Sequence, residues 1–301
     1  MPQNASKIEN PYSPAEQWSY LCQFILPEDQ ETLTSVYRYA TRVHEGEYRR
    51  SAESSEPIPY IVHPLRVARI LAEEWEDKSK SSLAAALLHD VLEYCHPTRL
   101  EEMENDITRL TNREVRDAVR ALTKPRLPEP CPPDAKAARE ARYFSQLRAA
   151  SNWVRLVKCA DRVDNLRDAR AWGDKDFWTR YSSETLGWHL FLARETAPIA
   201  EVALFKALVE GERDIRGRVP VWADGNLIDP VAAALVPENI ARDYGAIGLA
   251  VRGDLLIVGM RNPKDIQALA TLRVTTQKEI EALPISQEAL NDALSAELFG
   301  F

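Results

Sequence analysis

The stretch Leu83–Tyr94 constrains the fold more than any other part of this sequence. It reads LAAALLHDVLEY, so nearly every position before His89 is apolar. An apolar run of this length without a polar face is typical of a helix buried inside a protein. His89 and Asp90 therefore need partners in the interior, because an unpaired buried carboxylate either costs several kcal/mol or changes its pKa.

One divalent cation would satisfy both His89 and Asp90, and a third polar group follows them. Glu93 comes four residues after His89, so on a continued helix it would lie one turn further along the same face. The pair also fits a simpler arrangement, in which a core histidine precedes an acid at the helix surface. The rest of the chain decides between the two.

Composition limits the class of protein. The 301 residues suffice for one large domain or two, and the net charge of -8 argues against a nucleic-acid partner. The chain lacks a run of about 18 apolar residues that would span a bilayer, and its N-terminus lacks the apolar core of a secretory signal. The four cysteines form no Cys-x-x-Cys pair, as suits a reducing compartment. We therefore expect a cytoplasmic, mostly helical protein without a membrane span.

The spacing of apolar residues changes between residues 212 and 218. Before this point apolar residues recur at helical spacing, including one long pattern over 183–209. Beyond it, the apolar runs 247–251 and 255–260 are joined by an Arg-Gly-Asp sequence, which indicates a β-hairpin. The sequence thus predicts a mostly α fold, with an all-helical domain over 1–212 and a small α+β domain over 218–301.

A second apolar helix carries another unusual acid. Asp161 and Asn165 lie one turn apart in a segment that is otherwise apolar enough to be buried, so Asp161 needs a cation or hydrogen-bond donors. Together with His63, at the start of another predicted helix, the unusual buried polar residues are His63, His89, Asp90 and Asp161. Two imidazoles and two carboxylates without thiolates suit manganese or a similar divalent ion better than structural zinc.

Such a metal site suggests phosphoryl chemistry. A bound divalent ion lowers the pKa of water and polarises a phosphoryl oxygen, and Glu93 is placed to orient or deprotonate that water. An anionic substrate would meet basic side chains, since a guanidinium offers a bidentate fork to phosphate. The candidates are Arg49, Arg50, Lys124 and Arg167.

Five segments, in this order, resemble the HD-type hydrolase domain of the RelA/SpoT family, the alarmone hydrolases. They are His44-x-Gly46-x-x-Arg49-Arg50-Ser51, Tyr60-Ile-x-His63-Pro-Leu, Ala85-Ala-Leu-Leu-His89-Asp90-Val-Leu-Glu93, Leu122-Thr-Lys124 and Lys158-x-Ala-Asp161-Arg-x-x-Asn165-Leu-Arg167. Together they span about residues 30–200. The resemblance implies a manganese-dependent release of the 3′-pyrophosphate from guanosine tetra- and pentaphosphate.

The resemblance also implies a role for each candidate residue. These roles are metal ligands for His63, His89, Asp90 and Asp161, catalytic roles for Glu93 and Asn165, and substrate contacts for Arg49, Arg50, Lys124 and Arg167. Glu93 would belong to a catalytic acidic pair, Asn165 would contact the ribose–phosphate region, and Arg49 would pack against the purine base. No segment resembles the synthetase domain of the family, so we expect a small, hydrolase-only member.

Two positions depart from the family pattern. The family usually has an Asp after the Glu of its acidic pair, whereas this chain has Tyr94, whose phenol with a pKa near 10 is no base at neutral pH. The loop 52–57 is also longer than the tight turn of the family. These departures leave two alternatives open: hydrolysis of another purine nucleotide (an adenosine alarmone, a dinucleotide cofactor phosphate or a cyclic dinucleotide), or a non-catalytic nucleotide-binding regulator.

The C-terminal unit resembles a second family. Leu227-Ile-x-Pro230, Val236-Pro-Glu-Asn-Ile-Ala-Arg242-x-Tyr244 and Leu255-x-Ile-Val-Gly-Met260-x-Asn-Pro263-x-Asp265 look like the N-terminal domain of GspE/PilB-type secretion ATPases. Some relatives of that domain bind cyclic di-GMP through an Arg-Leu-Gly repeat, which this chain lacks, and the ATPase motif Gly-x-x-x-x-Gly-Lys-Ser/Thr is also missing. We expect residues 218–301 to contact a protein partner or a second copy of the chain.

Overall fold

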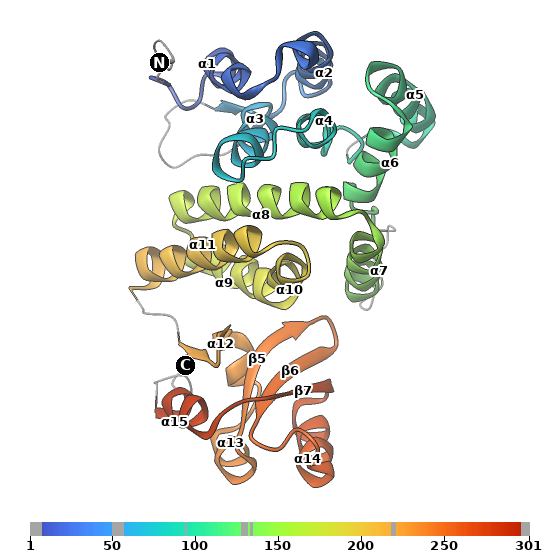
Figure 1. Cartoon of the computed structure of the whole chain (residues 1–301). Helices are drawn as coiled ribbons and strands as arrows, with labels where there is room; N and C mark the ends of the chain where they lie inside the picture. Colours follow the sequence, from blue (N-terminus) through green and yellow to red (C-terminus); the bar gives the residue numbers. More distant parts are fainter. Residues whose placement is uncertain are drawn as a thin grey trace.

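The structure, a computed structural model, describes residues 8–49, 57–93, 95–127, 132, 135–217 and 221–295. Its mostly helical part comes first and a small unit with strands follows, as the sequence predicts (Figure 1). In the described residues, no helix has both the length and the apolar composition that crossing a bilayer requires.

The first part consists mainly of α-helices. They are α1 (Pro14–Leu21), α2 (Gln30–Val43), α3 (Val62–Arg69), α4 (Lys80–Leu88), α5 (Leu100–Leu110), α6 (Arg113–Leu122), α7 (Ala135–Ala149), α8 (Asn152–Trp172), α9 (Lys175–Glu184), α10 (Leu190–Arg194) and α11 (Pro198–Arg216). Single turns join some of them: the 3-10 turns η1 (Cys22–Phe24), η2 (Pro27–Asp29) and η4 (Pro97–Arg99), and the π-helical turns η3 (Ile70–Glu74) and η5 (Thr185–His189). The two short strands β1 (Tyr48–Arg49) and β2 (Ile58–Pro59) pair antiparallel, so this part is not entirely helical.

Helix α8 is the centre of this part, with α3 and α4 on one side and α9 to α11 on the other (Figure 1). It is 21 residues long and buries side chains all around its middle, which explains its weak amphipathic pattern. The helix ends at Gly173, whose φ of 72° is the left-handed conformation that glycine adopts without strain. Because α8 is packed on both sides, a polar side chain on it must find partners on neighbouring helices.

Helix α4 is shorter than predicted. Ser79 caps its start by accepting a hydrogen bond from the amide of Ser82, and every residue from Ser82 to Leu88 is buried. The helix ends at Leu88, and residues 89–93 form turns in which the Glu93 amide donates to the Asp90 carbonyl. The expectation that Glu93 lies one helical turn beyond His89 was therefore wrong.

The single helix expected over 183–209 was also wrong. It is divided into the end of α9, η5, α10 and the start of α11, with a break at residues 195–197. Pro198 begins α11 at a position where its missing N–H is harmless, whereas inside a continuous helix it would remove a hydrogen bond. In addition, α11 continues to Arg216 and ends at Gly217, so the helical part extends beyond the predicted limit at residue 212.

The second part is built on a three-stranded sheet. Strands β5 (Ala246–Arg252) and β6 (Leu255–Met260) form the predicted hairpin, and β7 (Glu279–Pro284) runs parallel to β6 after the crossover helix α14 (Ile266–Thr276). The remaining elements are the short pair β3 (Trp222–Ala223) and β4 (Asn226–Leu227), and the helices α12 (Pro230–Ala234), α13 (Glu238–Tyr244) and α15 (Gln287–Ser295). Apolar residues of this unit, including Ile228, Ile247 and Leu249, join the same core as the helical part. The two parts are thus packed together.

Candidate metal centre

Four polar residues from three packed helical segments meet in the interior. His63 lies in the first turn of α3, His89 follows the last residue of α4 and Asp90 comes directly after it, and Asp161 lies in the middle of α8. The exposed fraction is 1% for His63, 2% for His89 and 5% for Asp161, so water reaches them little. The residues predicted to be metal ligands thus come from positions nearly a hundred residues apart and occupy one place.

The donor atoms face one another. His63 Nε2 lies 3.2 Å from His89 Nε2, 3.1 Å from Asp161 Oδ1 and 3.6 Å from Asp90 Oδ2. His89 Nε2 lies 3.1 Å from Asp90 Oδ2 and 3.6 Å from Asp161 Oδ1. Each imidazole nitrogen therefore lies close to an oxygen of both acids. The donor atoms of His63, His89 and Asp90 all lie within 4.8 Å of one another, a group that does not include Asp161.

The outer nitrogens of both imidazoles fix their tautomers. His89 Nδ1 lies 2.8 Å from the Ala86 carbonyl oxygen, and His63 Nδ1 lies 2.6 Å from Asp164 Oδ2. Both partners are acceptors, so each Nδ1 carries a hydrogen, and each ring has its lone pair at Nε2 when it is in the neutral form that binds metal. Four electron-pair donors then face one another at close range, an arrangement that a cation satisfies.

The electrostatics of the cluster favour positive charge at its centre. Burial opposes ionisation of Asp90, but the charge and hydrogen bond of His89, with help from His63, outweigh burial and lower the pKa of this carboxyl. Burial likewise opposes ionisation of Asp161, yet Lys158 and the two imidazoles hold its pKa well below the usual range. In the case of His89, burial lowers the pKa, but the two carboxylates more than compensate and raise it. The donor set is therefore anionic and suited to a divalent ion.

Asp164, from α8, supports the cluster from behind. It is 2% exposed, and besides His63 it meets Arg66, whose Nε lies 2.8 Å from Asp164 Oδ1. Burial opposes ionisation of Asp164, but the Arg66 charge and the hydrogen bond from His63 keep its pKa below the ordinary value. A carboxylate behind a metal-binding histidine fixes the orientation of the ring and increases its basicity.

Two further side chains contact the acids of the cluster. The Tyr60 hydroxyl donates to Asp90 Oδ2 at 2.7 Å, and Lys158 Nζ lies 2.8 Å from Asp161 Oδ2. Asp90 uses the same oxygen, Oδ2, for Tyr60 and for the imidazoles. Asp161 instead faces the imidazoles with Oδ1 and Lys158 with Oδ2. In both cases a donor holds the carboxylate in place. None of Tyr60, Lys158 and Asp164 was predicted as a site residue, although all three lie in the segments that carry the predicted ligands.

Glu93 lies in the turn that follows Asp90 and is partly exposed. Burial, followed by the Asp90 charge, raises its pKa, and the Lys158 charge opposes this shift. A carboxylate with a raised pKa is a stronger base than an ordinary glutamate. Tyr94 and Arg50, as well as the loop 52–56, lie outside the described residues.

Arg49 and Asn165 lie beside the cluster. The Asn165 amide nitrogen donates to Asp161 Oδ1 at 2.5 Å, and its carbonyl oxygen accepts a hydrogen bond from Arg49. Arg49 Nη1 also lies 3.0 Å from Asp168 Oδ2 and 3.6 Å from Asp164 Oδ2. The two residues predicted to contact the nucleoside are thus joined to each other and to a cluster acid.

The other two predicted substrate contacts lie further out. Lys124 Nζ pairs with Glu140 at 2.7 Å and lies 5.8 Å from the centre of the Tyr143 ring, which in turn lies 5.5 Å from Lys158 Nζ. Arg167 forms two hydrogen bonds with Glu74, at 2.7 and 2.8 Å. Neither residue contacts any of the four cluster residues in the described part of the chain.

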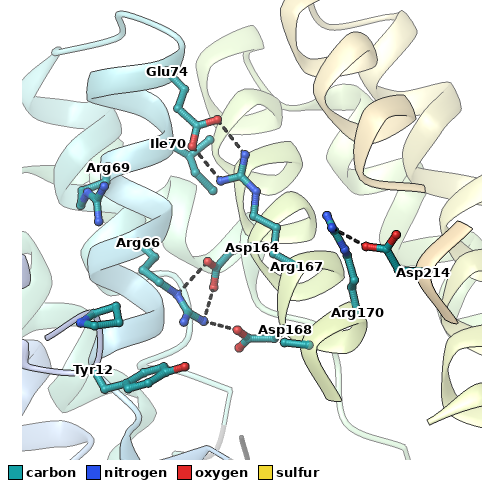
Figure 2. Close-up of a pocket in the computed structure, with 12 residues that line it drawn as sticks. Tyr12, Arg66, Arg69, Ile70, Glu74, Asp164, Arg167, Asp168, Arg170 and Asp214 are labelled. Atoms are coloured by element: carbon teal, nitrogen blue, oxygen red, sulfur yellow. Dashed lines mark hydrogen bonds and ion pairs between the residues drawn. The ribbon is translucent and has the colours of Figure 1, made fainter. Parts of the chain in front are cut away.

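Figure 2 shows the surroundings of Arg167, a cavity of about 600 Å³ next to Asp164. Arginines from α3 and α8 line this cavity, and carboxylates balance them: Arg66 with Asp164 and Asp168, and Arg170 with Asp214. The cavity therefore lies toward the Nδ1 side of His63, away from the point where the four donor atoms meet. A second cavity, of about 430 Å³, has Asp90 in its wall. Its lining also includes His44, Arg42 and Arg99.

Comparison with known protein families decides the relationship of the chain. The family model of the HD domain matches residues 37–193, which include all four cluster residues. The chain belongs to the HD domain family. The model of the MshEN domain matches residues 219–296, the part that contains β3 to α15. Both resemblances seen in the sequence are thereby confirmed.

Several relatives carry names that describe an activity. The bifunctional (p)ppGpp synthase/hydrolase SpoT of Escherichia coli is 37% identical over 155 residues, which are 50% of this chain and 20% of SpoT. The guanosine-3′,5′-bis(diphosphate) 3′-pyrophosphohydrolases MESH1 of Danio rerio and Xenopus tropicalis are each 32% identical, over 68% and 73% of their length. This chain thus spans about a fifth of the SpoT protein. A solved structure described as "A metazoan ortholog of SpoT hydrolyzes ppGpp and plays a role in starvation responses" has a TM-score of 0.47 at 23% identity, covering 61% of this chain and 96% of that chain.

Proposed function

We propose that this chain is a metal-dependent 3′-pyrophosphohydrolase of guanosine alarmones. The observation that carries the proposal is that His63 Nε2 and His89 Nε2 lie 3.2 Å apart and that each lies within 3.6 Å of a carboxylate oxygen of Asp90 and of Asp161. The names of the SpoT and MESH1 relatives support the substrate class. Asp161 is the strongest argument for a metal site over a core histidine with a neighbouring acid, because it comes from a different helix far along the chain and still lies beside the His-Asp pair.

The metal would be held by His63, His89, Asp90 and Asp161, and we propose manganese, because nitrogen and oxygen donors without thiolates suit it. When bound, an ion of this kind supplies an acidic water molecule and polarises a phosphoryl oxygen. The other residues of the site orient the ligands, bind the substrate and accept the proton. Asp164 and the Ala86 carbonyl keep the two imidazoles in the tautomer that binds metal.

Hydrolysis needs a base for the attacking water, and we assign this role to Glu93. Water adds to the phosphorus attached to the ribose 3′-oxygen, its proton passes to the Glu93 carboxylate, and the bond between phosphorus and the 3′-oxygen breaks. That proton then passes from Glu93 to the departing 3′-oxygen, so the products are guanosine 5′-di- or triphosphate with a free 3′-hydroxyl, and pyrophosphate. The raised pKa of Glu93 makes the carboxylate a better proton acceptor near neutral pH than an ordinary glutamate.

Positive side chains next to the cluster would bind the anionic substrate. Lys158 is partly buried beside Asp161, whose charge outweighs burial and keeps the ammonium protonated by raising its pKa. Arg49 would meet the purine and Asn165 the ribose–phosphate region, as their mutual hydrogen bond and their position beside Asp161 allow. We retain Arg50, Lys124 and Arg167 as outer substrate contacts, of which Arg167 would first have to leave Glu74.

The proposal is tested by the release of pyrophosphate from a panel of nucleotides with manganese added. Guanosine tetra- and pentaphosphate should be cleaved, and the corresponding adenosine nucleotides, a dinucleotide cofactor phosphate and a cyclic dinucleotide serve as the alternatives. Asp161→Asn is the matched control, because it removes one ligand charge with little change of shape. Preferred cleavage of another member of the panel would show that the substrate is not a guanosine alarmone. If no nucleotide is cleaved in a metal-dependent reaction, the proposal that the protein is an enzyme is wrong.

We further propose that residues 218–301 contact a protein partner or a second copy of the chain. On α14, Ile266 is 83% exposed and Val274 is 79% exposed, which is unusual for large apolar side chains. They lie eight residues apart, and therefore on the same face of the helix. Light scattering on the full chain and on Val274→Glu tests self-association: a smaller particle for the variant supports it.

A further inference from the structure

The π-helical turn η5 (Thr185–His189) is one of the places where the C-terminal unit contacts the helical part. Arg252, at the end of β5, donates from Nε to the Gly187 carbonyl oxygen at 2.8 Å. A Cβ atom on Gly187 would lie 2.0 Å from the Val251 carbonyl oxygen, so the hairpin fits against this turn only because residue 187 is glycine. Single π-helical turns inside helices occur frequently at functional sites.

Aromatic rings hold the charged end of Arg252. Its guanidinium carbon lies 4.5 Å from the centre of the Phe191 ring and 5.3 Å from that of the Trp188 ring. Within the described part of the chain, no carboxylate lies within 4.0 Å of this guanidinium. The cation is therefore fixed by ring faces and a carbonyl group, a geometry that lysine does not reproduce.

The rings continue from this point toward the metal centre. Trp188 stacks on Phe144 with ring centres 4.8 Å apart, and Phe144 meets Tyr143 edge-on at 5.5 Å. The Tyr143 ring lies 5.5 Å from Lys158 Nζ and 5.8 Å from Lys124 Nζ. Both ammonium groups that would meet an anionic substrate thus lie within 6 Å of the centre of a ring that contacts Phe144, the residue on which Trp188 stacks.

A second set of contacts starts from the same turn. Thr185 Oγ1 accepts a hydrogen bond from Arg162 Nε at 2.8 Å, and Arg162 is the neighbour of Asp161 on α8. Glu184, just before the turn, lies 3.4 Å from Arg162 and 3.8 Å from Lys124. The turn therefore contacts the metal-ligand segment of α8 and the predicted substrate lysine at once.

We propose that Arg252 is a positioning residue of the hydrolase site: the C-terminal unit uses it to lock η5, and η5 sets the places of Lys124 and Lys158 on the substrate side. The assignment of these lysines rests on the proposed function. Arg252 itself touches neither substrate nor metal. Loss of this lock weakens substrate binding and leaves the four metal ligands assembled.

The test compares Arg252→Ala with Arg273→Ala, an arginine of the same unit that lies on α14 away from the interface. For Arg252→Ala we expect the KM for guanosine tetraphosphate to rise about 3–10-fold, with kcat and manganese affinity within about two-fold of wild type. Arg273→Ala should leave all three unchanged. Gly187→Ala, which forces the hairpin away from the turn, should reproduce the rise in KM. If Arg252→Ala does not fold, Arg252→Lys keeps the charge but loses the carbonyl contact and should show the same direction of change.

Hydrogen exchange on the full chain provides a readout that does not need activity. Arg252→Ala should accelerate exchange in residues 185–192 and also in residues 158–165, relative to Arg273→Ala. Acceleration confined to 185–192, together with an unchanged KM, would overturn the positioning role. If wild type cleaves no nucleotide while both segments respond, the proposed function fails and the contact between η5 and α8 stands.

Discussion

Asp164 is the residue whose replacement tests the design of the metal centre most sharply. It accepts a charge-assisted hydrogen bond from His63 Nδ1 at 2.6 Å, and at 2% exposure solvent does not screen this bond. Removal of a carboxylate behind a metal-binding histidine typically costs about 10–100-fold in metal affinity, or about 1.4–2.7 kcal/mol. Asp164→Asn keeps an acceptor oxygen, but its amide nitrogen is also able to donate, which stabilises the wrong tautomer of His63.

We therefore expect the Kd for manganese to increase about 10-fold in Asp164→Asn and about 100-fold in Asp164→Ala. Calorimetric titration of manganese into metal-free protein measures both values. Asp168→Asn is the matched control, since Asp168 shares the partners Arg49 and Arg66 with Asp164 but has no contact with His63. Thermal unfolding without metal separates loss of affinity from loss of folding. A Kd for Asp164→Ala within two-fold of Asp168→Asn would refute the reasoning.

Three further perturbations have defined outcomes. Asp161→Ala should abolish both manganese binding and hydrolysis, because it removes one of four donors and leaves Lys158 without its partner. Metal analysis and a pyrophosphate assay measure the two effects, and bound metal at the wild-type level would contradict the prediction. Glu93→Gln should retain metal and lower kcat by about 10²–10⁴-fold, as expected for a lost general base; an unchanged rate would place the base elsewhere. Asp229 has a pKa that burial raises to about 6, so the folded state binds its proton more tightly than the unfolded state does, and stability falls as pH rises from about 4 to about 6. Asp229→Asn should remove this dependence of the unfolding free energy on pH and stabilise the protein at pH 7 by about 2–3 kcal/mol, as measured by urea unfolding. If the unfolding free energies of the two proteins depend on pH in the same way, the carboxyl titrates normally.

The sequence indicated which polar residues are unusual. Helical geometry explains which of their positions in the structure were predicted correctly. Asp161 and Asn165 are four residues apart and lie on the same face of α8, as expected. Arg167 is six residues from Asp161, which at about 100° per residue turns it about 120° away, and the structure accordingly places it in another cavity, beside Glu74. The same rule brings Asp164 to within about 60° of Asp161, so its role behind His63 was within reach of the sequence.

Other features depend on tertiary contacts that carry no local signal. Helix α4 ends at Leu88 although neither glycine nor proline follows, and this places Glu93 in a turn. The Tyr60 hydroxyl reaches Asp90 only because α3 and α4 pack together. The fit of the hairpin against Gly187 joins residues 65 positions apart in the sequence, and no periodicity predicts such a contact.

The central claim is that four side chains bind one divalent ion. Anomalous diffraction at the manganese absorption edge, from crystals grown with manganese, tests it most directly. We expect a single peak within bonding distance of His63 Nε2, His89 Nε2 and carboxylate oxygens of Asp90 and Asp161. A manganese peak elsewhere, with none at the meeting point of these four side chains, would contradict it.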